Sequence, residues 1–139
     1  TLAIAESCSG GLLCHRITNI PGSSAYFKLG IICYSNESKV FLLKVSQKTL
    51  GRFGAVSPQV AIPLAKNIRK IAHADLGLSV TGIAGPTGAT AKKPIGLVYI
   101  AVADKNRAFC HKFIFKGKRL SIKQQSAEQA LKILKKFIS

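Results

Sequence analysis

Short apolar runs alternate with amphipathic stretches along the 139 residues. Apolar runs bounded by glycine or polar residues predict buried strands, whereas apolar side chains three or four residues apart predict helices. Strands are predicted over residues 2–6, 29–34, 76–81, 95–103 and 108–115. Helices are predicted over 10–19 and 36–43, from Ser46 through about Phe53, from Ser57-Pro58 onward, and at the end of the chain. Strands that alternate with helices and end in one hairpin predict an α/β fold, a three-layer α/β/α sandwich with a mixed sheet.

The two longest helices have the clearest signals. Pro58 suits a first helical turn, and an apolar stripe follows it at helical spacing. That stripe consists of Val60, Leu64, Ile68 and Ile71. The stripe of the final helix consists of Ile122, Ala127, Ala130, Leu131, Leu134 and Ile138.

The length and composition predict a single domain over residues 1–139. The hydrophobic fraction of 47% is that of a globular protein, and no apolar run approaches the roughly 20 residues of a membrane helix. The chain begins with Thr1 at the start of a strand, so we expect upstream residues outside this numbering. The four cysteines are scattered, which favours reduced thiols and a cytoplasmic protein.

Charge and metal-binding patterns restrict the partners. Neither the cysteines nor the three histidines have ligand spacing, so we expect no metal and no cofactor. The formal charge of +16 favours anionic partners, and the densest basic region runs from Lys112 to Lys136. No known nucleic-acid-binding module accompanies this charge, so specific nucleic-acid binding is not expected.

The first turn, Glu6 to Gly11, joins a strand to a helix and carries small polar residues. Its backbone N–H groups could hold an anion, or Ser9 could simply cap the helix. Cys8 at this helix start is also a candidate thiolate nucleophile. The loop from Gly82 to Gly88 has the same two interpretations, a substrate loop or a flexible connection.

A second cluster of polar residues contains Ser24, Tyr34 and Lys39. A serine becomes a nucleophile only beside a proton acceptor, and a lysine serves when burial makes its neutral amine accessible. Spacing alone favours Lys39 as a solvated helix residue rather than a catalytic base.

Several strings in one order resemble the CinA C-terminal domain family. They are AESCSGG from residue 5, PGSSAYF from residue 21, YSNESK from residue 34, GAVS from residue 54, TGIAGP from residue 81, KPIG from residue 93 and GKR from residue 117. The resemblance implies an anticodon-binding-domain-like fold and a homo-oligomer. It also implies that a helix normally precedes the first strand.

The resemblance further implies a nicotinamide-nucleotide amidase, which converts nicotinamide mononucleotide and water to nicotinic acid mononucleotide and ammonia in pyridine-nucleotide salvage. It puts the nucleophile on Ser24 and proton transfer on Tyr34 and Lys39. Water would then hydrolyse the acyl ester. The small-molecule nucleotide would contact seven residues, namely Ser7, Ser9, Gly10, Gly82, Ala84, Gly85 and Arg119.

The chain departs from the family pattern at a few positions. Ser9 stands where Thr is usual, Ser38 where Ala is usual and Lys118 where Asp is usual, and residues 87–91 lack the usual glycine-rich or acidic loop. Two alternatives to the enzyme therefore stay open: a non-catalytic module that binds nucleotides or nucleic acid, and a degenerate structural domain.

Overall fold

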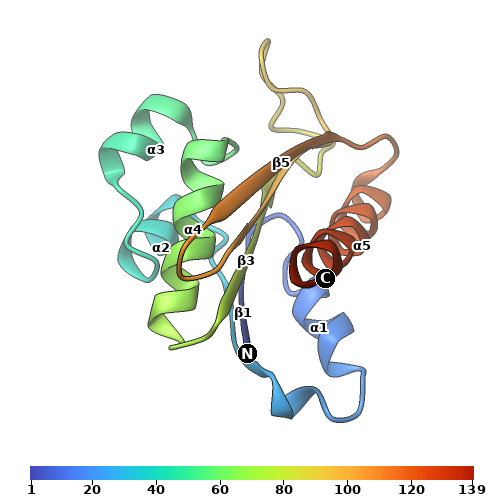
Figure 1. The fold of residues 1–139 in the computed structure, drawn as a ribbon. Coiled ribbons are helices and arrows are strands. Elements are labelled where there is room, and N and C mark those ends of the chain that lie inside the picture. The colour runs from blue at the N-terminus through green and yellow to red at the C-terminus, as the bar shows by residue number, and fades with distance from the viewer.

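The computed structural model describes residues 1–139 (Figure 1). The elements in chain order are β1 (Leu2–Glu6), α1 (Leu12–Thr18), the 3-10 turn η1 (Ser23–Ala25), β2 (Phe27–Ile32), α2 (Asn36–Phe41), α3 (Gln47–Phe53), α4 (Pro58–Ile71), β3 (Leu76–Gly82), β4 (Leu97–Ala103), β5 (Ala108–Ile114) and α5 (Arg119–Ile138). None of these helices combines the length and apolar character needed to cross a bilayer. Each predicted strand and helix is present, with shifts of a few residues at the ends.

The five strands form one mixed sheet in the order β2-β1-β3-β4-β5. β1 pairs in parallel with both β2 and β3, whereas β4 and β5 are antiparallel additions. The α/β fold with a mixed sheet is therefore confirmed. The carboxyl ends of β1, β2 and β3 meet at one edge, where open α/β sheets form their ligand crevices.

Both faces of the sheet are covered by helices. Alternate side chains of β1 point to opposite faces: Leu2 and Ile4 pack in the core beneath α1 and α5, and Ala3 and Ala5 pack in the core beneath α4. Figure 1 shows α1 and α5 on one side of the sheet and α2, α3 and α4 on the other. Burial on both faces explains why the residues of β1 are uniformly apolar up to Glu6.

β2 begins and ends two residues earlier than its sequence pattern predicted. The N–H of Leu2 donates to the carbonyl of Tyr26 at 2.8 Å, so pairing with β1 starts before Phe27. At the other end, the carbonyls of Cys33 and Tyr34 accept hydrogen bonds from Lys39 and leave the ladder.

Candidate functional site

A polar cleft of about 290 Å³ opens at the carboxyl ends of β1, β2 and β3. Its wall contains seven of the residues predicted from sequence, namely Ser7, Tyr34, Lys39, Gly82, Ala84, Gly85 and Arg119. The remaining predicted residues, Ser9, Gly10 and Ser24, do not line it.

Lys39 enters the cleft from α2. The Ser35 hydroxyl accepts the N–H of Ser38 at 3.0 Å and so begins this helix one turn before the lysine. The side chain of Lys39 is 1% exposed. Its Nζ lies 2.9 Å from Ser7 Oγ, 2.7 Å from the carbonyl oxygen of Cys33 and 3.2 Å from that of Tyr34. The serine that Lys39 meets is thus Ser7.

The surroundings of Lys39 make its neutral form more accessible than that of an exposed lysine. No carboxylate forms a salt bridge with it, and burial lowers the pKa of its ammonium group below the ordinary 10.5. A neutral amine can still donate its two N–H bonds to the carbonyls of Cys33 and Tyr34. Its lone pair then faces Ser7 Oγ, which is the geometry of a general base beside a nucleophile.

The turn that carries Ser7 is held by Glu6, whose side chain is fully buried. The Glu6 carboxylate accepts the backbone N–H groups of Gly11, Leu13 and Cys14 at 3.1, 3.0 and 2.7 Å. Gly11 has a φ of 97°, a conformation that favours glycine. The backbone amides in the first turn of α1 therefore bind the carboxylate of Glu6 and are not free to bind an anionic ligand.

Two interpretations of this turn need correction. Ser9 is not the cap of α1, because the helix begins after Gly11 and its first amides are satisfied by Glu6. The Ser9 hydroxyl is buried and makes no hydrogen bond. Gly10 faces solvent next to Lys123 rather than the cleft.

Cys8 lines the cleft beside Ser7 but is a poor nucleophile. Burial raises the pKa of its thiol to about 12, with a smaller contribution from the negative charge of Glu6. At neutral pH the group is therefore a thiol, not the reactive thiolate. The helix start that was expected to lower this pKa is already occupied by the carboxylate of Glu6.

Arg119 crosses the mouth of the cleft from the first turn of α5. Its guanidinium donates to the carbonyl oxygen of Gly85 at 2.7 Å and to the hydroxyl of Tyr34 at 2.9 Å. The hydroxyl of Tyr34 is thus engaged with Arg119, and its link to Lys39 is through the backbone carbonyl. Arg119 thus lies at the rim of the cleft and keeps further N–H groups free. The Ser7–Lys39 pair forms the floor of the same cleft.

Ser24 lies at the other end of β2, in the exposed turn η1. The strand between Phe27 and Ile32 separates it from the cleft by about 17 Å, from a rise of about 3.3 Å per residue. Within one chain, the structure does not bring Ser24 to Lys39 or Tyr34. The sequence shows that Ser7 directly follows the first predicted strand, but the parallel pairing that brings the carboxyl ends of β1 and β2 to one edge is seen only in the structure.

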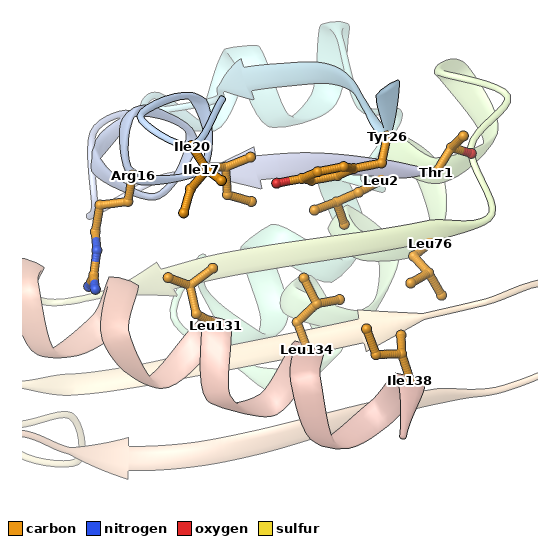
Figure 2. Close-up of a pocket in the computed structure, with 10 residues that line it drawn as sticks. All are labelled: Thr1, Leu2, Arg16, Ile17, Ile20, Tyr26, Leu76, Leu131, Leu134 and Ile138. Carbon is orange, nitrogen blue, oxygen red and sulfur yellow. The ribbon is translucent and has the colours of Figure 1, made fainter. Parts of the chain in front are cut away.

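The motif around Ser24 borders a different hollow. Figure 2 shows that the ring of Tyr26 lies beside Leu2 and Ile17, between α1 and α5. This hollow of about 420 Å³ is lined by eight hydrophobic residues among ten, and Arg16 is its charged member. It contains no nucleophile with a neighbouring base. No three His, Cys, Asp or Glu side chains anywhere gather closely enough to ligate one metal ion.

The fold and the cleft define a class of protein: an α/β domain with a buried serine–lysine pair at the carboxyl edge of its parallel strands. Comparison with known proteins places it more narrowly. The chain belongs to the CinA C-terminal domain family, whose model matches residues 1–138.

Curated relatives agree with this assignment. A putative competence-damage inducible protein of Caldicellulosiruptor saccharolyticus is 53% identical over 137 residues, which cover 99% of this chain and 33% of that protein. A CinA-like protein of Endomicrobium trichonymphae is 48% identical over 136 residues, 98% of this chain and 32% of that protein. The chain thus spans about a third of the length of these relatives.

Solved structures match over nearly the whole chain. A competence/damage inducible protein from Agrobacterium tumefaciens superposes with a TM-score of 0.97 at 37% identity, covering 100% of this chain and 86% of that one. A CinA superfamily protein from Enterobacter cloacae gives a TM-score of 0.95 at 30% identity, covering 99% of this chain and 82% of that one. The fold is therefore that of the CinA C-terminal structures.

Proposed function

We propose that the chain hydrolyses the carboxamide of nicotinamide mononucleotide, with Ser7 as nucleophile and Lys39 as general base. The observation that carries the proposal is the hydrogen bond of 2.9 Å between Lys39 Nζ and Ser7 Oγ in a buried site without a carboxylate partner. The substrate comes from the family resemblance, and the cationic rim at Arg119 supports an anionic nucleotide. Ser7 takes the role first assigned to Ser24.

In the first half of the reaction, Ser7 Oγ attacks the carboxamide carbon while the neutral amine of Lys39 takes the hydroxyl proton. The negative oxygen that forms needs N–H donors. The backbone N–H of Cys8 donates to no backbone carbonyl and is next to the nucleophile, so it is our candidate donor. The C–N bond then breaks, and the Lys39 ammonium returns its proton to the departing ammonia.

In the second half, water attacks the nicotinoyl ester of Ser7. Lys39, neutral again, takes a proton from this water and gives it back to Ser7 Oγ as the ester bond breaks. The sum is one amide and one water converted to one carboxylic acid and one ammonia. The step uses no metal or organic cofactor.

Substrate binding falls to the rim and the β3–β4 side of the cleft. Arg119 can place a fork of N–H donors on phosphate oxygens, which a single point charge cannot do. Gly82, Ala84 and Gly85 form the opposite wall, where the N–H groups of Ala84 and Gly85 make no hydrogen bond within the protein. Tyr34, held by Arg119, would then position the nucleotide rather than transfer protons.

The proposal is tested by incubating the chain with nicotinamide mononucleotide and measuring ammonia and nicotinic acid mononucleotide in equal amounts. Lys39→Met is the matched control, because it keeps a long side chain and removes the base. Binding without turnover by the folded wild-type chain would favour the alternative of a non-catalytic nucleotide-binding module. Neither binding nor turnover would favour a degenerate structural domain.

Several other expectations stay predictions. They are a single domain over residues 1–139, an anticodon-binding-domain-like relationship of the fold, a homo-oligomeric state and a cytoplasmic location. The oligomeric state can be measured by light scattering on the purified chain.

A further inference from the structure

A second groove lies between β5 and the C-terminal part of α5, and it shares no residue with the Ser7–Lys39 cleft. Its volume is about 290 Å³. β5 is the edge strand at the opposite end of the sheet from β2. Its lining includes Arg107, Phe109, His111, Lys136 and Phe137. The proposed amidase uses none of these residues.

A row of rings continues from the groove along β5. Phe109, His111 and Phe113 occupy alternate positions and therefore share one face of the strand, and Phe115 follows after its end. Ring centroids of His111 and Phe113 are 6.4 Å apart, and those of Phe113 and Phe115 are 5.3 Å apart in a stacked arrangement. Phe109 is 49% exposed. The row extends over about 20 Å, from a rise of about 3.4 Å per residue.

Two lysines near this row are not used in internal ion pairs. Lys105 and Lys136 are exposed and form neither a salt bridge nor a side-chain hydrogen bond. Arg107 does pair with Asp104, yet its side chain remains 57% exposed. Its guanidinium lies 4.4 Å from the ring centre of Phe137, so the groove presents charge and aromatic surface together.

The acidic residues leave this positive charge almost unopposed. The chain has only five. Asp75 accepts a hydrogen bond from the Thr1 hydroxyl, Asp104 pairs with Arg107, and Glu128 pairs with Arg16 and Lys132. Glu6 is buried under backbone amides, and none of the five acidic residues lines the groove. A surface of this kind attracts polyanions.

We propose that the β5–α5 groove binds single-stranded nucleic acid without sequence preference. Bases stack on aromatic side chains whatever their identity, and the phosphates that link them pair with flanking lysines and arginines. A duplex hides the base faces, so the row of rings favours a single strand. An anionic membrane offers negative charge but nothing to stack. Phe113 and Phe115 are partly buried against the core, so the exposed rings of Phe109 and His111 would stack with the bases.

The test measures fluorescence anisotropy of labelled 20-nucleotide oligo(U) and oligo(dT) with the whole chain between 50 and 200 mM salt, a range over which phosphate contacts weaken strongly. The groove variant combines Lys105→Gln, Arg107→Gln and Lys136→Gln. We expect it to bind at least about tenfold more weakly at 50 mM salt. We also expect the slope of log K against log[salt] to fall by about 2, since each lost phosphate contact on a single strand removes about 0.7.

The matched control removes the same charge from exposed lysines of α3 and α4, with Lys48→Gln, Lys66→Gln and Lys70→Gln. It should bind within about twofold of wild type. Phe109→Leu tests stacking separately and should weaken binding severalfold with an unchanged salt slope. Circular dichroism and thermal unfolding verify that each variant is folded.

Three results would overturn the proposal: no binding at 50 mM salt, equal losses in the two triple variants, or Phe109→Leu and wild type binding alike. A fourth is a preference for vesicles of one-third phosphatidylserine that the groove variant abolishes while the oligonucleotides stay unbound. That outcome would assign the groove to a membrane surface. None of these measurements depends on amide hydrolysis.

Discussion

Lys39 Nζ lies 2.9 Å from Ser7 Oγ, although 32 residues separate them in the chain. The contact exists because β1 and β2 are parallel neighbours, so the turn after β1 and the helix after β2 meet at one edge of the sheet. The catalytic predictions below depend on this pair.

Ser7→Ala should lower kcat for the carboxamide by about a thousandfold or more, because it removes the atom that forms the acyl bond. Ser24→Ala should stay within about threefold of wild type, since Ser24 is exposed at the far end of β2. Steady-state ammonia release compares the two serines directly. The reverse pattern would remove Ser7 from the reaction and would require Ser24 to reach the cleft of a second copy.

The pH dependence should report the lysine. Protonated Lys39 cannot accept the proton of Ser7, so kcat/KM should rise with pH through the pKa of Lys39, which burial lowers below 10.5. The midpoint should therefore lie at a lower pH than for an ordinary lysine. Lys39→Arg should be inactive across the whole range, because arginine stays protonated. A profile without a rising limb, or an active Lys39→Arg variant, would contradict the general-base role.

Arg119→Ala should raise KM for the mononucleotide by about ten- to hundredfold, the value of a hydrogen-bonded charge on phosphate. It should have a much smaller effect on inhibition by the dephosphorylated nucleoside. Lys118→Ala is the control, as this neighbouring cation is exposed and has no side-chain partner. If Arg119→Ala weakened nucleotide and nucleoside equally, the residue would serve the shape of the cleft through Gly85 and Tyr34.

Glu6→Gln should lower the free energy of unfolding by about 2–4 kcal/mol, because three backbone N–H groups lose a charged acceptor in a buried site. Glu37→Gln, at an exposed position without a cation partner, should change it by less than about 0.5 kcal/mol. Urea unfolding followed by circular dichroism measures both. Equal stability of the two variants would mean that Glu6 does not organise the first turn.

Local pattern was sufficient for much of the fold. The strand–helix order, the Ser46 cap and the hairpin of β4 and β5 depend on residues close together in sequence, so they could be predicted from it. The prediction of which helix residues face the core was less accurate. Ile71 is 43% exposed and Ile138 is 61% exposed, although both belonged to predicted apolar stripes, because each lies at the last turn of its helix where the core ends.

The residues of the candidate site could also be predicted only in part from the sequence. The sequence identified Lys39, Tyr34, Arg119 and the β3–β4 loop, because their residue types suit the chemistry and their strings resemble one family. The family resemblance selected Ser24, but residue type alone does not separate the two serines, since both Ser7 and Ser24 stand in polar turns next to a predicted strand.

Only the tertiary structure shows which of the two serines lies beside Lys39 within one chain, through the order and direction of the strands. Parallel pairing of β1 and β2 brings Ser7 to the carboxyl edge with Lys39 and leaves Ser24 at the amino edge. The same packing buries Lys39 and thereby lowers its pKa, and it gives the amides of α1 to Glu6. Burial and the pairing of distant strands depend on the whole fold. The sequence supplies the side chains, and the fold determines which of them are buried and which lie next to one another.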